Sequence, residues 1–266
     1  SLKEMPLAME WAAREGWNPG LHDAACFYAA DPAGFLVGEL AGEPIGCISA
    51  VKYGSEFGFI GLYIVRPEFR GRGYGIQLWR AGMERLAGRN VGLDGVVAQQ
   101  ANYAASGFRL AFRNVRYQGA VHDAGESDEL PRGVIAASAV PFAELAAYDH
   151  AIFPAPRDAF LKSWLAQPEA GAFVAVKEKG LGGYVVVRRC REGWKIGPLA
   201  ADDRPTARRL YDAVAGYAGV GATLFLDVPA GNDAAHQLVA ELGMTPVFET
   251  ARMYTGSAPA VDLSKL

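Results

Sequence analysis

Hydrophobic and polar positions follow two rhythms along the first half of the chain. Apolar side chains recur at helical spacing, which predicts helices, over residues 2–15, 21–29, 75–86 and 102–106. Short apolar runs bounded by turn residues, which predict strands, lie at 35–40, 45–53, 59–65, 92–98 and 108–117. The predicted order is two helices, three strands, a helix, a strand, a helix and a strand.

The second half repeats this order of elements. Residues 167–174 echo 31–37, and a second hairpin follows over 181–190. The later strands and helices of the repeat are predicted at 194–199, 206–214, 224–228, 232–238 and 248–254. The last of these segments, 248–254, is expected to complete the sheet of the second half.

A polar, acidic stretch without hydrophobic periodicity separates the two halves at residues 122–131. We therefore expect one domain over 1–121, a linker over 122–131 and a second domain over 132–266. A chain of 266 residues is long enough for two such domains.

The composition narrows the class of partner. Hydrophobic residues make up 51% of the chain and charged residues 21%, so there is ample apolar material for folded cores. A net charge of -3 argues against nucleic acid or an anionic membrane as the main partner, although Arg66, Arg70 and Arg72 form a local basic patch. A diffusible small molecule is the expected partner.

Cysteine and histidine spacing predicts no metal site and no disulfide framework. The three cysteines are far apart and include no C-x-x-C pair: Cys26, Cys47 and Cys190. The four histidines share no metal-ligand spacing. Together these features favour a reducing, cytoplasmic location. No apolar run reaches the roughly 20 residues of a membrane span.

The stretch between strand 59–65 and helix 75–86 has the composition of an anion-binding turn. Gly71, Gly73 and Gly75 lack Cβ atoms, so backbone N–H groups can converge on an anion there. The helix that begins at the turn adds the partial positive charge of its N-terminus. Because glycines also occur in tight turns that bind nothing, the turn alone has two interpretations: a pyrophosphate site or a structural turn.

The residues around the glycines favour the pyrophosphate site. The order V-x-P-x-x-R-G-x-G-x-G resembles the acetyl-CoA motif R/Q-x-x-G-x-G/A of the GNAT family of N-acetyltransferases, with Arg70, Gly73 and Gly75 at its fixed positions. No Gly-Lys-Ser/Thr follows, as a Walker loop would require. The resemblance implies that acetyl-CoA binds to the end of the strand and to the turn, at Tyr63, Ile64, Val65, Arg70, Gly71, Arg72, Gly73, Tyr74 and Gly75.

The order of predicted elements also resembles the GNAT family. It implies an α/β (α+β) fold of two tandem GNAT-like units, each a mixed, mostly antiparallel, twisted sheet flanked by helices. The family's usual first strand would precede Ser1. In the second half, residues 200–206 replace the glycine turn and contain no glycine. Asp202 and Asp203 would repel a pyrophosphate or simply cap the helix, so we expect acetyl-CoA in the N-terminal half only.

Tyr103 is the catalytic residue that the resemblance implies. GNAT enzymes usually reprotonate the leaving thiolate with a tyrosine four residues before a Gly-Phe, and Tyr103 precedes Gly107 and Phe108 at that spacing. The alternative is an aromatic ring that packs on the sheet. The family's pantetheine-binding asparagine is not at its usual place, so that contact falls to Asn102, or to Gln99 or Gln100.

The general base and the acceptor site are left open. Some relatives place the base where this chain has Phe59 and Gly61; here Glu15, Asp23 or Glu56 serves through water, or the amine arrives neutral. Polar and aromatic residues in the helix-loop-helix that walls the acceptor side predict either a pocket for a small polar amine or simple packing: Trp11, Glu15, Trp17, Asn18, His22 and Asp23. A similar second-half set either closes that site or holds the halves together: Asp149, His150, Phe153, Arg157 and Trp164.

Three functions fit these observations. The first is an N-acetyltransferase that transfers an acetyl group from acetyl-CoA to a small-molecule amine in a ternary complex. The second is a non-catalytic acyl-CoA-binding or sensor module, and the third is a protein lysine or N-terminal acetyltransferase. Tyr103 favours the first.

Overall fold

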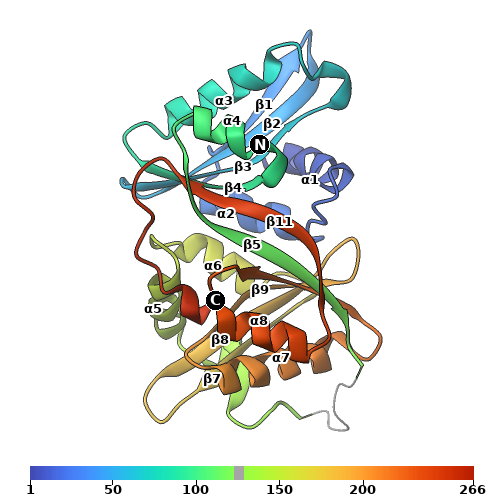
Figure 1. Ribbon diagram of the computed structural model, residues 1–266, viewed down its shortest axis with the longest axis vertical. Coiled ribbons are helices and arrows are strands. Elements are labelled where there is room, and N and C mark those ends of the chain that lie inside the picture. Colours follow the sequence, from blue (N-terminus) through green and yellow to red (C-terminus); the bar gives the residue numbers. More distant parts are fainter. Residues whose placement is uncertain (123–128) are drawn as a thin grey trace.

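One continuous sheet runs through the computed structural model, which describes residues 1–122 and 129–266, and helices cover both faces of that sheet (Figure 1). The predicted linker, 122–131, falls largely outside the described residues. The strands are β1 (Phe35–Leu40), β2 (Glu43–Tyr53), β3 (Phe57–Val65), β4 (Asn90–Val96), β5 (Arg109–Ala120), β6 (Val134–Ala136), β7 (Ala170–Val176), β8 (Leu181–Arg189), β9 (Trp194–Ala201), β10 (Thr223–Pro229) and β11 (Thr245–Tyr254).

The described helices are α1 (Met5–Arg14), α2 (Asp23–Ala30), α3 (Tyr74–Arg85), α4 (Gln100–Ala105), α5 (Phe142–Ile152), α6 (Asp158–Leu165), α7 (Arg204–Ala218) and α8 (Asp233–Glu241). Six of these helices lie where the sequence predicts them, and α5 and α6 are additional. Short 3₁₀ turns occupy Leu2–Glu4, Pro67–Phe69, Val97–Gln99, Ala137–Ala139 and Leu263–Lys265.

The two halves exchange strands at the centre of the sheet. Its strand order is β1-β2-β3-β4-β11-β5-β10-β9-β8-β7-β6, so β11 lies inside the first half and β5 beside the second (Figure 1). The prediction that 248–254 completes the second half's sheet is wrong, because β11 pairs antiparallel with β4 and β5. The exchange leaves neither half with an open strand edge at the junction, and open edges are sites of unwanted pairing.

Helices on opposite faces of the first half bury two separate apolar clusters. On one face α3 packs over β2 and β3 through Leu78 and Trp79. On the other face α1 contributes Met9 and Trp11 to a cluster that includes Ile64. Successive β3 side chains point to opposite faces, as the period of a strand requires. The first-half sheet is therefore sandwiched between α3 and the α1–α2 pair.

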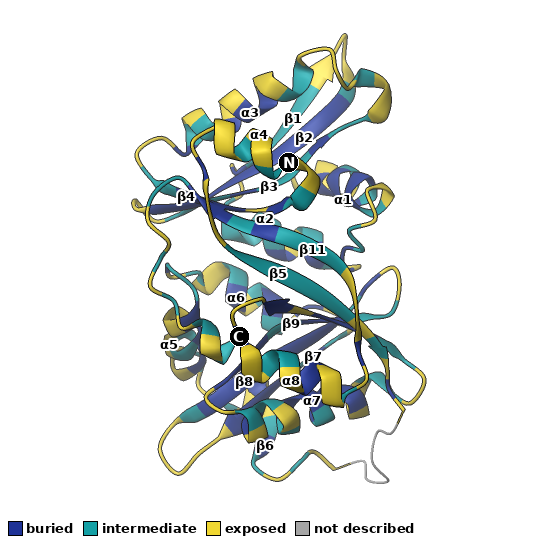
Figure 2. Cartoon of the chain, viewed as in Figure 1, coloured by how far each residue is buried: buried dark blue, intermediate teal, exposed yellow. Residues whose placement is uncertain are grey.

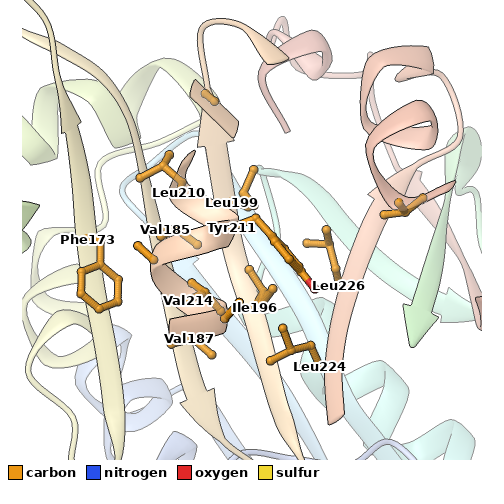
Figure 3. Packing of buried hydrophobic residues seen from close by; sticks show 14 of the residues in the cluster. Phe173, Val185, Val187, Ile196, Leu199, Leu210, Tyr211, Val214, Leu224 and Leu226 are labelled. Atoms are coloured by element: carbon orange, nitrogen blue, oxygen red, sulfur yellow. The ribbon is translucent and has the colours of Figure 1, made fainter. Parts of the chain in front are cut away.

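The second half has its own core between α7 and the sheet (Figure 3). Leu210 and Val214 of α7 are fully buried against Val185 of β8 and Leu224 of β10. Figure 2 shows burial across the molecule: the strands are largely buried, whereas the helices are exposed on their outer faces.

The α1–α2 segment joins the two halves. Phe27 of α2 stacks on Trp164 of α6, with ring centroids 5.9 Å apart. Asp23 accepts hydrogen bonds from the Arg188 guanidinium of β8 at 2.8 and 3.4 Å, and both residues are buried. Because a buried ion pair is costly to break, this contact fixes the position of the loop before α2.

Candidate active site

The strands β3 and β4 separate halfway along their length. They pair in parallel only from Phe57 and Asn90 to Ile60 and Leu93, although β3 continues to Val65. At the point of separation Leu62 has a positive φ of 45°, and the pairing of β3 with β2 is irregular. Backbone groups on the open edges of both strands therefore face a gap in the sheet rather than each other.

The glycine turn ends at the uncapped N-terminus of α3. Gly71 and Gly73 have φ of 72° and 83°, a region that favours glycine. Gly73 is the N-cap residue and supplies no side chain to the first-turn N–H groups of α3. A Cβ on Gly75 would come within 2.8 Å of the Tyr63 hydroxyl, so glycine lets the helix approach β3. These features together make a cradle for an anion.

Two arginines of the turn are already in contact with the protein. The Nε of Arg70 donates to the carbonyl of Val65 at 2.7 Å, and its guanidinium is also paired with Glu15 at the end of α1. The guanidinium of Arg72 lies over the rings of Phe69 and Tyr74, at 5.7 and 5.4 Å from their centroids. Arg70 thus links the turn to α1, while exposed Arg72 keeps its positive charge beside the turn.

A cavity of about 560 Å³ opens where β3 and β4 separate. Its wall is formed by both halves of the chain: Glu15, Trp17, Ile60, Gly61, Leu62, Tyr63, Ile64, Val65, Arg70, Leu93, Asp94, Gly95, Val96, Gln99, Tyr103, Asn114, Arg116, Asp227, Phe248 and Thr250. It brings together eight of the residues predicted from the sequence: Glu15, Trp17, Tyr63, Ile64, Val65, Arg70, Gln99 and Tyr103. The assignment of these residues to cofactor, acceptor and catalysis stays a prediction.

The cavity reaches both faces of the sheet. Tyr63, Val65 and Tyr103 in its wall pack with the cluster under α3. Leu62, Ile64 and Trp17 in the same wall pack with the cluster under α1. The cavity therefore passes through the sheet at the gap between β3 and β4, so two reactants can approach from opposite faces.

Tyr103 stands at the α3 side of this passage. Its ring lies 5.6 Å from that of Trp79 and covers Gly95, where an added Cβ would come within 2.3 Å of the ring. Within the described residues its hydroxyl has no hydrogen-bond partner. Burial, and to a lesser degree the charge of Tyr63, raises the pKa of Tyr103 to about 12. The hydroxyl is therefore protonated at neutral pH and able to act as an acid.

Other predicted residues have different positions. Asn102 donates to the side-chain oxygen of Gln99 at 2.6 Å, and it is Gln99 that lines the cavity. Trp11 is buried in the cluster under α1, and Glu56 lies outside the cavity wall. Asp23 is bound to Arg188 and does not line the cavity either. Of the three carboxylates considered as a base, only Glu15 reaches the site.

Two members of the second-half set of polar and aromatic residues, Phe153 and Trp164, contact the first half. Asp149 forms an ion pair with Arg157 at 2.6 Å and accepts from the hydroxyl of Tyr184. Phe153 packs edge-on against Tyr53 and Phe57 of the first half, at 5.0 and 5.8 Å. None of this set lines the cavity. The structure thus favours the packing interpretation over a role in closing the site.

The cavity residues absent from the sequence-based candidates include six on β4, β5, β10 and β11: Asp94, Asn114, Arg116, Asp227, Phe248 and Thr250. The internal repeat carried a signal for some of them. Asp94 and Asp227 are each the single charged residue of a mostly apolar strand, at matching places in the two halves. Phe112 and Phe248 likewise each precede an arginine by four residues. An alignment of the repeats for polar positions would have selected these strands.

The second half has the same strand separation, but it is filled. Pairing of β9 with β10 ends at Ile196 and Leu226, and the cavity beyond it measures only about 40 Å³. Leu263–Lys265 and Leu266 occupy this place, where Asn232 donates to the carbonyls of Leu263, at 3.0 Å, and Leu266. So little space has no room for a cofactor arm.

Side chains also occupy the N-terminus of α7, which corresponds to that of α3. Asp203 accepts from the N–H of Thr206 at 2.8 Å, and Asp202 is bound by Lys177 and Lys265 at 3.0 and 2.9 Å. These contacts lower the pKa of both carboxyl groups, so both are charged at neutral pH. The predicted capping role of Asp203 is confirmed.

The described residues contain no cluster of His, Cys, Asp and Glu side chains that would hold a metal ion.

Among the helices that the structure describes, none combines the length and the apolar character needed to cross a bilayer.

Comparison with known families and proteins identifies both halves. Residues 4–108 match the model of the acetyltransferase (GNAT) family, and residues 145–266 match that of an acetyltransferase (GNAT) domain. A holothin acyltransferase from Pseudoalteromonas sp. (strain SANK 73390) is 31% identical over the whole chain and 90% of its own length.

Solved structures share the fold. A putative acetyltransferase from Pyrococcus horikoshii superposes with a TM-score of 0.82 at 20% identity, covering 100% of this chain and 90% of its own. A tandem GNAT protein from the clavulanic acid biosynthesis pathway gives a TM-score of 0.63 at 15% identity, covering 97% and 95%. Together with the sequence matches, these findings show that the chain is a tandem GNAT protein and belongs to the GNAT family of acyltransferases.

Proposed function

We propose that this protein is an acetyl-CoA-dependent N-acetyltransferase that acts on a small-molecule amine by direct transfer in a ternary complex. The observation that carries the proposal is the cavity through the sheet, with Tyr103 toward α3 and Trp17 toward α1. Such a passage brings two bound reactants together without a covalent enzyme intermediate. The holothin acyltransferase, which matches the whole chain, supports acyl transfer as the reaction.

The first half fits acetyl-CoA, which the GNAT family generally uses. The uncapped N-terminus of α3 and the positive-φ glycines at 71 and 73 would hold the pyrophosphate. The open edges of β3 and β4 would hold the amide groups of the pantetheine arm by backbone hydrogen bonds. Acetyl-CoA, when bound, supplies the acetyl group as a thioester.

Tyr103 serves as the general acid. As the amine nitrogen forms the new C–N bond and the C–S bond breaks, the Tyr103 hydroxyl gives its proton to the leaving thiolate. Its hydroxyl is protonated at neutral pH, and the raised pKa makes it a weaker acid than an exposed tyrosine, so proton transfer depends on its position beside the leaving sulfur. The tyrosinate is then reprotonated from solvent, which restores the starting state.

The amine enters the reaction neutral. The carboxylates in the cavity wall, Glu15, Asp94 and Asp227, are each already bound to an arginine. We therefore assign the amine proton to solvent. The rate with a given amine should rise with pH up to the pKa of that amine, and a rate independent of pH in this range would contradict the assignment.

Binding of acetyl-CoA tests the turn. At about 100 times its dissociation constant the ligand should stabilise the wild type by about 2.7 kcal/mol, measured as a rise in Tm. Gly73→Asp should abolish the rise, since it places a negative charge at the N-terminus of α3. Gly73→Ala is the control, because it introduces the same positive-φ strain without the charge and should keep most of the rise.

Activity is tested with labelled acetyl-CoA and a library of metabolite amines. Transfer of label to a small amine, lost in Gly73→Asp, is the expected result. Binding of acetyl-CoA without transfer to any amine would instead identify a non-catalytic binding module. An unchanged Tm rise in Gly73→Asp would remove the basis of the proposal.

A further inference from the structure

The wall of the cavity beyond β4 comes from the exchanged strands. Asp227 of β10 and Phe248 and Thr250 of β11 belong to the second half, yet they line the same cavity as Tyr103. Between them lie Asn114 and Arg116 of β5. Only the strand exchange brings these side chains to the site, so the second half forms part of it.

Two matching ion pairs hold this wall. Arg116 of the first half donates to both oxygens of Asp227 at 2.6 and 2.8 Å, and Arg252 of the second half donates to both oxygens of Asp94 at 2.6 Å. Arg116 also lies 5.5 Å from the ring centroid of Phe248. Each pair therefore fixes a carboxylate of one half with a guanidinium of the other.

The carboxylates, rather than the guanidiniums, are the more accessible partners. The side chain of Asp227 is 44% exposed against 15% for Arg116, and that of Asp94 is 31% exposed against 22% for Arg252. A carboxylate has about four lone-pair sites, and a bidentate arginine uses only two of them. The Asn114 amide donates to Asp94 at 3.1 Å, which takes up one of its N–H groups.

This part of the cavity is thus rich in carboxylate oxygens that can accept further hydrogen bonds. The arginine and asparagine donors beside them are already engaged. A ligand that supplies donors is favoured there, and one that supplies a positive charge is favoured more. Phe248 and Trp17 offer apolar ring surface for the carbon skeleton of the same ligand.

The strands β4 and β10 are separated by β11 and β5, so three strand steps place them about 14 Å apart along the sheet.

We propose, on the basis of the function proposed above, that Asp227 is a specificity-determining residue for the acceptor. The acceptor carries a second N–H-bearing or cationic group besides the reacting amine. That second group binds the free lone pairs of Asp227 while the reacting amine lies at the gap between β3 and β4. The acceptor class is therefore an elongated amine with a polar, donor-bearing far end.

Matched amines test this inference. Putrescine, hexamethylenediamine and decamethylenediamine are compared with butylamine, hexylamine and decylamine as acceptors for acetyl-CoA. In the wild type kcat/KM should favour the diamine about ten-fold or more, as expected for a hydrogen bond to a charged group. The preference should be largest for decamethylenediamine, whose length is closest to the distance of about 14 Å across the strands.

Variants separate recognition from stability. Asp227→Asn should reduce the diamine preference toward one through KM while acetyl-CoA binding is unchanged. Asp227→Glu keeps the charge and extends it into the cavity, so the preference should move to a shorter diamine. Glu249→Gln is the control, because Glu249 of β11 pairs with Arg113 of β5 at 2.9 Å outside the cavity, and it should keep the wild-type preference.

Three results would overturn the inference. They are equal kcat/KM for diamines and monoamines in the wild type, a diamine preference that survives Asp227→Asn, and binding of acetyl-CoA without acetylation of any diamine. Failure of acetyl-CoA to bind at all would contradict the proposed function instead. The binding measurement therefore distinguishes the two failures.

Discussion

Replacement of Tyr103 by phenylalanine removes one oxygen atom from the site and leaves the packing in place. The ring is held between Trp79 and Gly95, contacts that phenylalanine keeps. Because the hydroxyl has no hydrogen-bond partner within the described residues, its loss should change the free energy of unfolding by less than about 1 kcal/mol. Turnover should fall about 100-fold or more, as expected for loss of a general acid.

The pH dependence of kcat is an independent test of the acid role of Tyr103. A tyrosine of ordinary pKa would lose its proton near pH 10, and an acid-dependent rate would fall there. Since burial raises the pKa of Tyr103 to about 12, the wild-type rate should show no fall from this group up to about pH 10.5. Above that, the rate should decline as the folded-state tyrosine ionises.

The assay is steady-state acetyl transfer to an acceptor from the amine library, with acetyl-CoA binding measured by calorimetry. Gly95→Ala is the matched perturbation, because its Cβ would displace the Tyr103 ring while keeping the hydroxyl. A displacement of about 1 Å should also cost about 100-fold in turnover. Unchanged turnover in Tyr103→Phe, with acetyl-CoA still bound, would show that Tyr103 only packs and would refute the acid role.

Three further predictions concern the second half. Calorimetric titration should give one acetyl-CoA per chain, unaffected by Asp202→Asn or Asp203→Asn; a stoichiometry near two would show that the filled second site opens. Burial, with Arg116 nearby, lowers the pKa of Lys195 to about 8, so the folded protein loses this proton at a lower pH than the unfolded chain. The free energy of unfolding should therefore rise by about 1–2 kcal/mol relative to Lys195→Met between about pH 7.5 and 9.5. Parallel pH curves for the two proteins would disprove this. Asp23→Asn should lower the free energy of unfolding by about 3–5 kcal/mol by leaving Arg188 buried and unpaired, whereas Glu10→Gln, at the exposed pair with Arg191, should have little effect; similar losses in both would argue against it.

Local patterns were enough to predict most elements of this chain and its glycine turn, although β6, α5 and α6 were not predicted. Apolar periodicity located α3 and β3 to within two residues, because burial of one helix face or strand face acts on neighbouring residues. Gly71 and Gly73 indicated a turn that needs residues without Cβ atoms, and the structure has positive φ at both. The contrast between this turn and Asp202-Asp203 likewise followed from residue chemistry alone, since a capping carboxylate and an anion site exclude each other.

The tertiary structure decided which strands are neighbours and therefore what lines the cavity. β5 and β11 have similar patterns, and the backbone hydrogen bonds that join strands are the same for any side chain, so the pattern could not tell exchange from separate sheets. Each strand's own sequence predicts that it pairs, but its partner depends on the packing of the whole chain. That choice brings Asp227 of the second half to the cavity that contains Tyr103.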